Sequence, residues 1–258
     1  MTDSDALTQT LAHLAEQAGL NAAASPHQAQ VEGWLLRLSP GKAKRSRCVN
    51  ALAAGALPLD ELLARCRHSF AQSGLPLILR LTPFSQPADL DEQLARRGWR
   101  DFDPALVMVL AQLPAAPDLG EDHLIALSPA AYAQLVGELR GSSAAEIAGQ
   151  AQRLQAAPIP HQAFILQRNN TLLACGQVAV DGLMAGLFDI YTPEAQRGQG
   201  HALRLCQALL AHAATQKARH GYLQVGVDNH AAQRVYGRLG FIQAYRYHYR
   251  SDDPLAWD

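Results

Sequence analysis

The sequence lacks the cysteine and histidine patterns of metal-binding and disulfide-stabilised proteins. Its four cysteines, Cys48, Cys66, Cys175 and Cys206, are widely spaced, and neither a C-x-x-C pair nor an H-E-x-x-H motif occurs. Zinc sites need closely spaced thiolate or imidazole ligands, whereas the ten histidines are scattered along the chain. The sequence therefore predicts reduced, mostly buried thiols and no bound metal.

Long apolar segments and long runs of basic residues are also missing. No stretch approaches the roughly eighteen apolar residues that a membrane span needs, and the chain begins with polar and acidic residues, so we expect a cytoplasmic protein. The 22 basic and 23 acidic residues nearly cancel, which argues against nucleic acid or an anionic membrane as a partner. The sequence does not indicate an oligomeric state.

Apolar residues, in contrast, are plentiful. They make up 48% of the 258 residues, enough to build a hydrophobic core in one large domain or two small ones. Disorder is thereby excluded as a description of the whole chain.

The most informative segment runs from Gln196 to Ala202, between a predicted strand and a predicted amphipathic helix. Main-chain N–H groups at a helix N-terminus bind anions where no side chain blocks the approach, and Gly198 and Gly200 provide that clearance. A dinucleotide-binding loop would have a third glycine where Leu203 stands, and the Gly-Lys-Ser/Thr triplet of a phosphate loop is absent. The segment therefore predicts a pyrophosphate site of another kind.

Two patterns follow each other in this part of the chain. They are Arg197-x-x-Gly200-x-Ala202 and Asn229-x-x-Ala232-x-x-x-Tyr236-x-x-x-Gly240-Phe241. Their order and content resemble the GNAT superfamily of acetyl-CoA-dependent N-acetyltransferases. The resemblance implies an α/β (α+β) fold with a mixed, mostly antiparallel central sheet flanked by helices.

The hydrophobic pattern around these motifs is compatible with that fold. We expect strands at 163–168, 171–180 and 183–192, joined by type I′ turns at Asn169-Asn170 and Asp181-Gly182. After the glycine segment we expect a helix at 201–215, a strand at 222–227, a helix capped by Asn229 and ended by Gly240, and a strand at 241–250 that closes the sheet. Two helices, at 129–140 and 143–156, would open the domain.

The first part of the chain contains an imperfect repeat of this series. A helix at 59–73, a strand at 76–81, a helix at 90–97 and a strand after Gly98-Trp99 parallel residues 201–249. However, Leu94 stands where the second copy has Tyr236, and no glycine loop precedes the first helix. We therefore predict a degenerate GNAT-like domain at 1–113 that does not hold coenzyme A, a linker at 114–120 and an N-acetyltransferase domain at 121–258. An unrelated α/β cap and a coincidental pattern are the alternatives.

The resemblance also implies roles for individual residues. Tyr236 would be the general acid that protonates the leaving thiolate of coenzyme A, and a tyrosine that only packs in the core is the alternative. The main chain of Ile190, Tyr191 and Thr192 would pair with the pantetheine arm, and Asn229 would hydrogen-bond the cofactor. The pyrophosphate would lie at Arg197, Gly198, Gln199, Gly200, His201 and Ala202. Asp189 is the first choice for the general base, with Glu194, Asp228 and ordered water as alternatives.

The predicted activity is direct transfer of an acetyl group from acetyl-CoA to the primary amine of a small or amino-acid-like acceptor, without a covalent acyl-enzyme. Two alternatives remain. The chain could be a non-catalytic acyl-CoA sensor or assembly module, or it could use another acyl-CoA or a protein amine.

Overall fold

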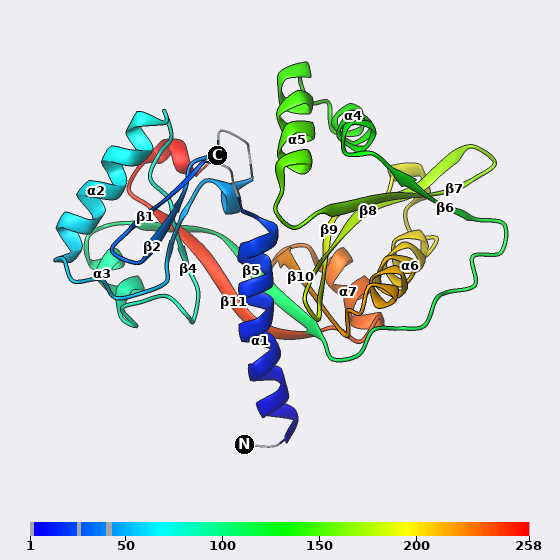
Figure 1. Ribbon diagram of the computed structural model, residues 1–258, viewed down its shortest axis with the longest axis horizontal. Coiled ribbons are helices and arrows are strands. Elements are labelled where there is room, and N and C mark those ends of the chain that lie inside the picture. Colours follow the sequence, from blue (N-terminus) through cyan, green and yellow to red (C-terminus); the bar gives the residue numbers. More distant parts are fainter. Residues whose placement is uncertain (1–2, 25–26, 40–42, 258) are drawn as a thin grey trace. The chain divides into compact units, whose positions relative to one another are not determined.

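The computed structural model describes residues 3–24, 27–39 and 43–257 (Figure 1). They form two compact units that interleave along the chain. Unit 1 comprises Met1–Ala22 and Val107–Ala244, and unit 2 comprises Ala23–Leu106 and Tyr245–Asp258. The predicted boundaries at residues 113 and 121 therefore differ from the boundaries of the compact units.

Unit 1 contains most of the regular structure. Its helices are α1 (Asp3–Ala22), α4 (Pro129–Arg140), α5 (Ala144–Ala156), α6 (His201–Thr215) and α7 (His230–Arg238), and a short 3-10 helix, η2 (Glu194–Gln196), precedes α6. Its complete strands are β6 (His123–Leu127), β7 (His161–Arg168), β8 (Thr171–Asp181), β9 (Met184–Tyr191) and β10 (His220–Gly226). The strand order is β10-β9-β8-β7-β6, in which β9 and β10 run parallel and the other pairs run antiparallel.

The two hairpin turns differ from each other. Asn169 and Asn170 both have positive φ, at 48° and 62°, which confirms the predicted type I′ turn. The second prediction was wrong in detail, because Asp181 pairs with Met184 and only Gly182 has a positive φ, at 57°. A positive φ at the first of two central residues is the pattern of a type II′ turn.

Helices cover both faces of this sheet (Figure 1). Helix α6 packs on β8 and β9 through a buried stripe that includes Leu205 and Leu209, whereas α4 packs with Cys175 of β8 through Tyr132. The neighbour of Cys175, Gly176, faces Leu205, so α4 and α6 lie on opposite faces.

Helix α1 also belongs to unit 1, although its residues lie within the predicted first domain, 1–113. Its buried residues recur with a helical period, at Leu11, Ala15, Ala18 and Ala22, and it packs on β8, β9 and β10. The apolar stripe was present in the sequence, but nothing in it indicated which sheet the helix would cover.

Unit 2 has a simpler arrangement. It contains β1 (Gln28–Val31), β2 (Trp34–Arg37), β3 (Val49–Ala51), α2 (Leu59–Gln72), β4 (Leu79–Leu81) and α3 (Leu90–Arg96), with short 3-10 helices η1 (Lys44–Ser46) and η3 (Pro254–Ala256). Strands β5 (Arg100–Leu110) and β11 (Ile242–Ser251) contribute residues to both units. Within unit 2 the order is β1-β2-β3-β4-β11, and β3 and β4 run parallel.

The series β3-α2-β4-α3-β5 has the same order as β9-α6-β10-α7-β11, and each series contains one parallel pair. The final strands, however, are exchanged. Strand β11 pairs antiparallel with β4 in unit 2, and the end of β5 lies beside β10 in unit 1. The expectation that 241–250 would close the sheet of its own half was therefore wrong, because the hydrophobic pattern of a strand does not specify its neighbour.

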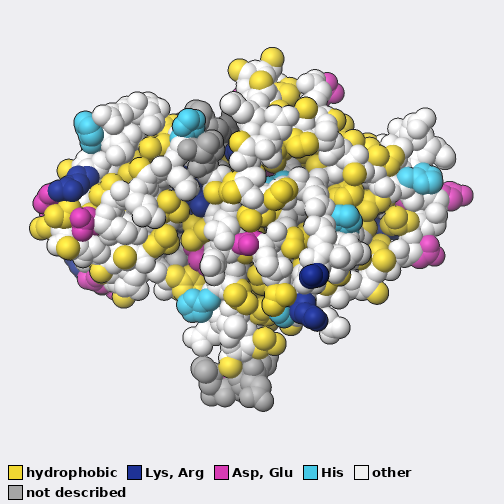
Figure 2. All heavy atoms as spheres, viewed as in Figure 1, with side chains coloured by type: hydrophobic (Ala, Val, Ile, Leu, Met, Phe, Trp, Pro, Cys, Tyr) yellow, Lys and Arg dark blue, Asp and Glu magenta, His cyan; other side chains and the backbone are white. Residues whose placement is uncertain are grey.

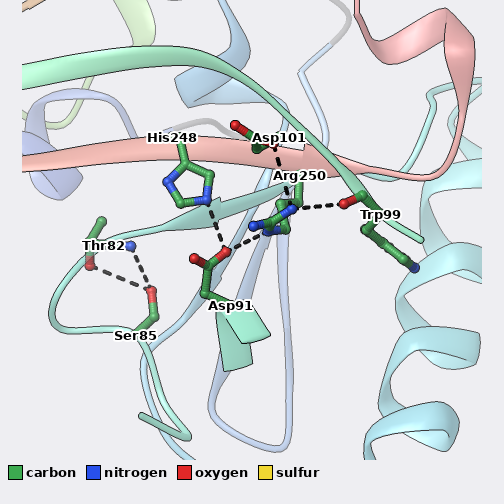
Figure 3. A network of polar contacts seen from close by, with 7 residues as sticks. All are labelled: Thr82, Ser85, Asp91, Trp99, Asp101, His248 and Arg250. Carbon is green, nitrogen blue, oxygen red and sulfur yellow. Dashed lines mark hydrogen bonds and ion pairs between the residues drawn. The ribbon is translucent and has the colours of Figure 1, made fainter. Parts of the chain in front are cut away.

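Polar contacts fix β11 within unit 2 (Figure 3). His248 and Arg250 both point toward Asp91 of α3, and their Nε2 and Nε atoms donate to its carboxylate over 2.9 and 2.5 Å. Arg250 also donates through Nη1 to the carbonyl oxygen of Trp99. Partial burial raises the pKa of Asp91, but the hydrogen bond from Arg250 and the contact with His248 outweigh it, so its pKa is lowered from the usual 3.8.

We expect Asp91→Asn to lower the free energy of unfolding by about 1 kcal/mol at neutral pH, because Arg250 would lose its charged partner while solvent screens the half-exposed pair. A carboxylate with a lowered pKa stabilises the fold above its unfolded pKa and loses this effect as the pH falls through its folded pKa. The difference between wild type and variant should therefore vanish in acid, below pH 3.8. Urea denaturation at several pH values measures this.

Glu92→Gln is the matched control, because Glu92 pairs with Arg96 at 3.6 Å with both side chains mostly exposed. We expect this variant to unfold like wild type at every pH. Equal behaviour of the two variants would contradict the anchoring role of Asp91.

Candidate active site

The glycine loop leads from η2 into α6 and exposes main-chain donors. Gly198 and Gly200 have φ values of 78° and 81°, and no atom lies within 4 Å of the position that a Cβ would take at either residue. The first main-chain bond of α6 runs from Arg204 N–H to the carbonyl oxygen of Gly200, so the N–H groups of residues 201–203 precede the helical ladder. Free donors, open space and the positive end of the helix dipole fit an anionic phosphate.

The side chains of the loop mainly maintain its shape. Arg197 donates to the carbonyl oxygen of Thr192 over 3.4 Å, and Gln199 donates to that of Ala195 over 3.2 Å. His201 is only 6% exposed, and neither ring nitrogen has a hydrogen-bond partner among the described residues. Its imidazole therefore lies in the interior, and His201 and Ala202 present main-chain groups to the loop.

A buried carboxylate beside this loop was missed in the sequence. The Asp122 side chain is fully buried and accepts hydrogen bonds from Arg168 of β7 and Arg204 of α6. Burial raises the pKa of Asp122, but the two arginines outweigh that effect and lower it. Burial in turn lowers the pKa of His201, which keeps its imidazole neutral. Asp122 thus ties the first turn of α6 to the sheet.

Strands β9 and β10 diverge before they end. Their ladder contains four residue pairs, from Met184↔His220 to Leu187↔Leu223, and β9 then continues to Tyr191 and β10 to Gly226. After Leu187, the edge of β9 that faces β10 has no strand partner in the described part of the chain, which includes all of residues 184–226. Exposed main-chain donors and acceptors at such an edge can pair with an extended ligand.

A β-bulge lies where the strands diverge. Cys175 pairs with Tyr191 and Gln177 with Phe188, so Asp189 and Ile190 together oppose Gly176. Asp189 has a φ of 50°, which is unusual for a residue other than glycine. A Cβ on Gly176 would lie 2.5 Å from the Cδ1 atom of Ile190, so a larger residue opposite the bulge would require the Ile190 side chain to move.

Three side chains surround Asp189. The Tyr132 hydroxyl of α4 donates to its carbonyl oxygen over 3.2 Å, and Gln177 Nε2 lies 3.5 Å from its Oδ2 atom. Arg140, the last residue of α4, has its Nη2 atom 3.5 Å from Oδ1. None of these three residues was predicted from the sequence, although Gln177, a single glutamine in the apolar run of β8, was a usable signal.

Tyr236 and Asn229 lie on α7. Tyr236 is 8% exposed, and its ring packs edge-on against Phe241 at a centroid distance of 6.1 Å. Burial, with a smaller effect from the Cys206 thiol, raises its pKa, so the phenol keeps its proton at neutral pH. Asn229 caps α7, because its Oδ1 atom accepts from Ala232 N–H over 3.1 Å.

The cysteines and the two alternative bases are the remaining candidates for a chemical role. All four cysteines are free and buried, as predicted, and burial raises the pKa of Cys175 to about 11 and that of Cys206 to about 12. Protonated thiols of this kind are poor nucleophiles. Glu194 and Asp228, the alternative bases, are exposed in η2 and in the turn before α7.

Some features are absent from the described part of the chain. Its residues include no group of three or more His, Cys, Asp and Glu side chains placed to hold a metal ion. Its helices include none with the length and apolar character to cross a bilayer. Figure 2 shows one face of the molecule, on which basic side chains lie scattered among apolar and uncharged ones.

Comparisons with known proteins concern this same region. Residues 136–241 match the sequence model of the acetyltransferase (GNAT) family. An uncharacterized N-acetyltransferase of Bacillus subtilis (strain 168), YobR, is 25% identical over 228 residues, covering 86% of this chain and 91% of that protein.

Solved structures agree at the level of the fold. A GCN5-related N-acetyltransferase from Kribbella flavida has a TM-score of 0.63 at 16% identity, covering 96% of this chain and 95% of that one. A tandem GNAT protein from the clavulanic acid biosynthesis pathway has a TM-score of 0.59 at 17% identity, covering 74% and 68%.

The matched segment contains the glycine loop, the diverging strands and Tyr236. Residues 136–241 therefore form an acetyltransferase domain of the GNAT family.

Proposed function

We propose that the chain transfers an acetyl group from acetyl-CoA directly to the primary amine of a small or amino-acid-like molecule. The observation that carries this proposal is the position of the glycine loop at the end of the strand that diverges from β10. The loop would bind the pyrophosphate through the main chain of residues 198–202, with Arg197 beside it. The main chain of Ile190, Tyr191 and Thr192, which has no strand partner on the β10 side, would hold the pantetheine arm, with Asn229 as a further hydrogen-bonding group.

Acetyl-CoA supplies the acetyl group as an activated thioester. The residues of the chain would then bind the reactants and move protons as the N–C bond forms and the C–S bond breaks. Tyr236, whose raised pKa keeps the hydroxyl protonated, would donate a proton to the leaving sulfur. Asp189 would accept a proton from the amine, because its carboxylate is partly exposed on the strand that carries the pantetheine.

Two alternatives are weighed against this proposal. A non-catalytic acyl-CoA sensor would need no proton donor, so the presence of Tyr236 favours an enzyme. An acyltransferase for a protein amine or a longer acyl chain shares the same loop, and the loop residues do not distinguish it. We favour a small acceptor because the near-neutral charge balance includes no large excess of acidic residues to attract a basic peptide.

We further propose that the first half of the chain is a degenerate copy that does not bind coenzyme A. Helix α2 begins after Pro58, and the nearest preceding glycine is Gly55. A Cβ atom added to Gly55 would be crowded, because it would lie 3.2 Å from Leu62 Cδ1 and 3.3 Å from Glu32 Cβ. This loop therefore lacks the open approach that Gly198 and Gly200 provide.

Gly200→Glu should abolish acetyl-CoA binding without unfolding the chain, because a carboxylate would place bulk and negative charge where the phosphate is proposed to lie. Isothermal titration calorimetry should give one site per wild-type chain and an affinity lower by about a hundred-fold or more in the variant. Gly182→Glu is the matched control, since Gly182 also has positive φ and open space. Unchanged affinity in folded Gly200→Glu would remove the pyrophosphate role.

Tyr236→Phe should leave acetyl-CoA affinity intact and lower kcat by roughly 10²-fold or more, because it deletes the proton donor and keeps the ring. Thiol release measures turnover. Tyr249→Phe removes a similarly buried hydroxyl in unit 2 and should be nearly silent. Wild-type turnover by Tyr236→Phe, with chemistry rate-limiting, would reduce Tyr236 to a packing residue.

Asp189→Asn should lower kcat in the thiol-release assay by roughly 10²-fold, because the amide does not accept the proton. Asparagine tolerates the positive φ of this position, so the bulge should persist. Glu194→Gln and Asp228→Asn test the alternative bases and should retain activity. A loss confined to one of those two variants would reassign the base.

A further inference from the structure

We propose that Arg140 binds the carboxylate of the acceptor, and that the acceptor is therefore an α-amino acid or a compound ending in an amino-acid group. This inference rests on the proposed function and assigns a specificity-determining role to a residue of α4. It follows from the ion pair between Arg140 and Asp189, from the exposure of both side chains and from the polar surroundings of the bulge.

The ion pair is long and partly open. Arg140 Nη2 and Asp189 Oδ1 are 3.5 Å apart, and the two side chains are 43% and 33% exposed. A guanidinium carries five N–H donors in a planar fork, and in the described part of the chain Asp189 is the acidic partner of this one. Most of its donors therefore remain available for a second anion, and a carboxylate matches the fork geometrically.

The carboxylate of Asp189 is held in a fixed orientation. Gln177 contacts Oδ2, so that Oδ1 lies on the side of Arg140. The Tyr132 hydroxyl, on the same helix as Arg140, bonds to the main-chain oxygen of Asp189 and fixes the bulge relative to α4. One helix thus determines both the position of the base and the position of the cation beside it.

The surroundings of Asp189 favour a ligand that brings hydrogen-bond donors. Gln177 is fully buried, and its side-chain oxygen Oε1 has no hydrogen-bond partner within the described residues. Together with the Asp189 carboxylate, this gives an excess of acceptors near the bulge. An amine is the complementary group, because it carries N–H donors.

An α-amino acid joins the two required groups at a suitable spacing. Its nitrogen and its carboxyl carbon are bonded to the same carbon atom and lie about 2.5 Å apart. The amine can face Asp189 while the carboxylate faces Arg140, since these two charges are themselves adjacent. A simple alkylamine would contact only Asp189 and would leave Arg140 without a ligand.

The experiment compares L-amino acids with the amines that result from removal of their α-carboxyl group. For wild type, thiol release should give kcat/KM values about ten-fold or more higher for the amino acid of an accepted pair. Arg140→Gln should lower kcat/KM for the amino acid by about ten-fold or more, mainly through KM, and should lower it markedly less for the amine, which loses only the effect of Arg140 on Asp189. Arg140→Lys keeps the charge and should show an intermediate loss.

Arg96→Gln is the matched control, because Arg96 also ends a helix and pairs with an acid at 3.6 Å, but in unit 2. It should behave like wild type with both acceptors. Equal losses for amine and amino acid in Arg140→Gln would overturn the inference, because Arg140 would then act only by positioning Asp189. A wild-type preference for the decarboxylated amines would overturn it as well.

Binding separates this inference from the proposed function. Calorimetric titration of the L-amino acids into wild type and Arg140→Gln, each saturated with coenzyme A, requires no turnover. Binding that depends on Arg140 would support the inference even if no acetylation occurred, and absence of binding to wild type would overturn it. Acetylation of carboxylate-free amines alone would overturn the inference while the proposed acetyltransferase function stood.

Discussion

The site depends on one constraint, which is that β9 pairs with β8 along its length, with one bulge, but with β10 over only four residues. Main-chain N–H and C=O groups need hydrogen-bond partners, and a strand that leaves its neighbour exposes a row of them. Here the ladder between β9 and β10 ends at Leu187, and the glycine loop follows the end of β9. The proposed cofactor would therefore form hydrogen bonds with main-chain groups of β9 that do not pair with β10.

The β-bulge places Asp189, the proposed base, beside the end of this ladder. Two residues, Asp189 and Ile190, oppose Gly176, so the alternation of side chains shifts by one position. A positive φ at a residue other than glycine costs roughly 1 kcal/mol or more, and such strain persists only where neighbours enforce it. Ile190 fills the space above Gly176, and Tyr132 binds the carbonyl oxygen of Asp189. These contacts retain the strained residue in a position where its carboxylate can act.

The exchange of β5 and β11 makes each half of the sequence contribute a strand to the other unit. The sheet of unit 2 includes β11, from the end of the chain, and Asp91 fixes that strand through His248 and Arg250. A cut near residue 113 would therefore remove a strand from both units.

The sequence alone determined the local features of the proposed site. Several of these features are backbone conformations that neighbouring residues set, namely the glycine pair at 198 and 200, the cap at Asn229 and the Asn169-Asn170 turn. Tyr236 belongs to the sequence pattern that begins at this cap. Helix periodicity likewise located α4, α5, α6 and α7 to within a residue or two. Such features are readable because their physical cause lies within a few residues.

Only the tertiary structure decided the long-range features. These features join residues that are far apart in the chain. They are the strand exchange, the packing of α1 on β8 to β10, the burial of Asp122 between Arg168 and Arg204, and the ion pair of Arg140 with Asp189. An apolar stripe on a helix shows that this face is buried, but it does not show against which sheet the helix packs. Similarly, a charged residue does not indicate which residue of opposite charge it pairs with. These choices follow from packing and electrostatics summed over the folded chain, which no short segment of the sequence contains.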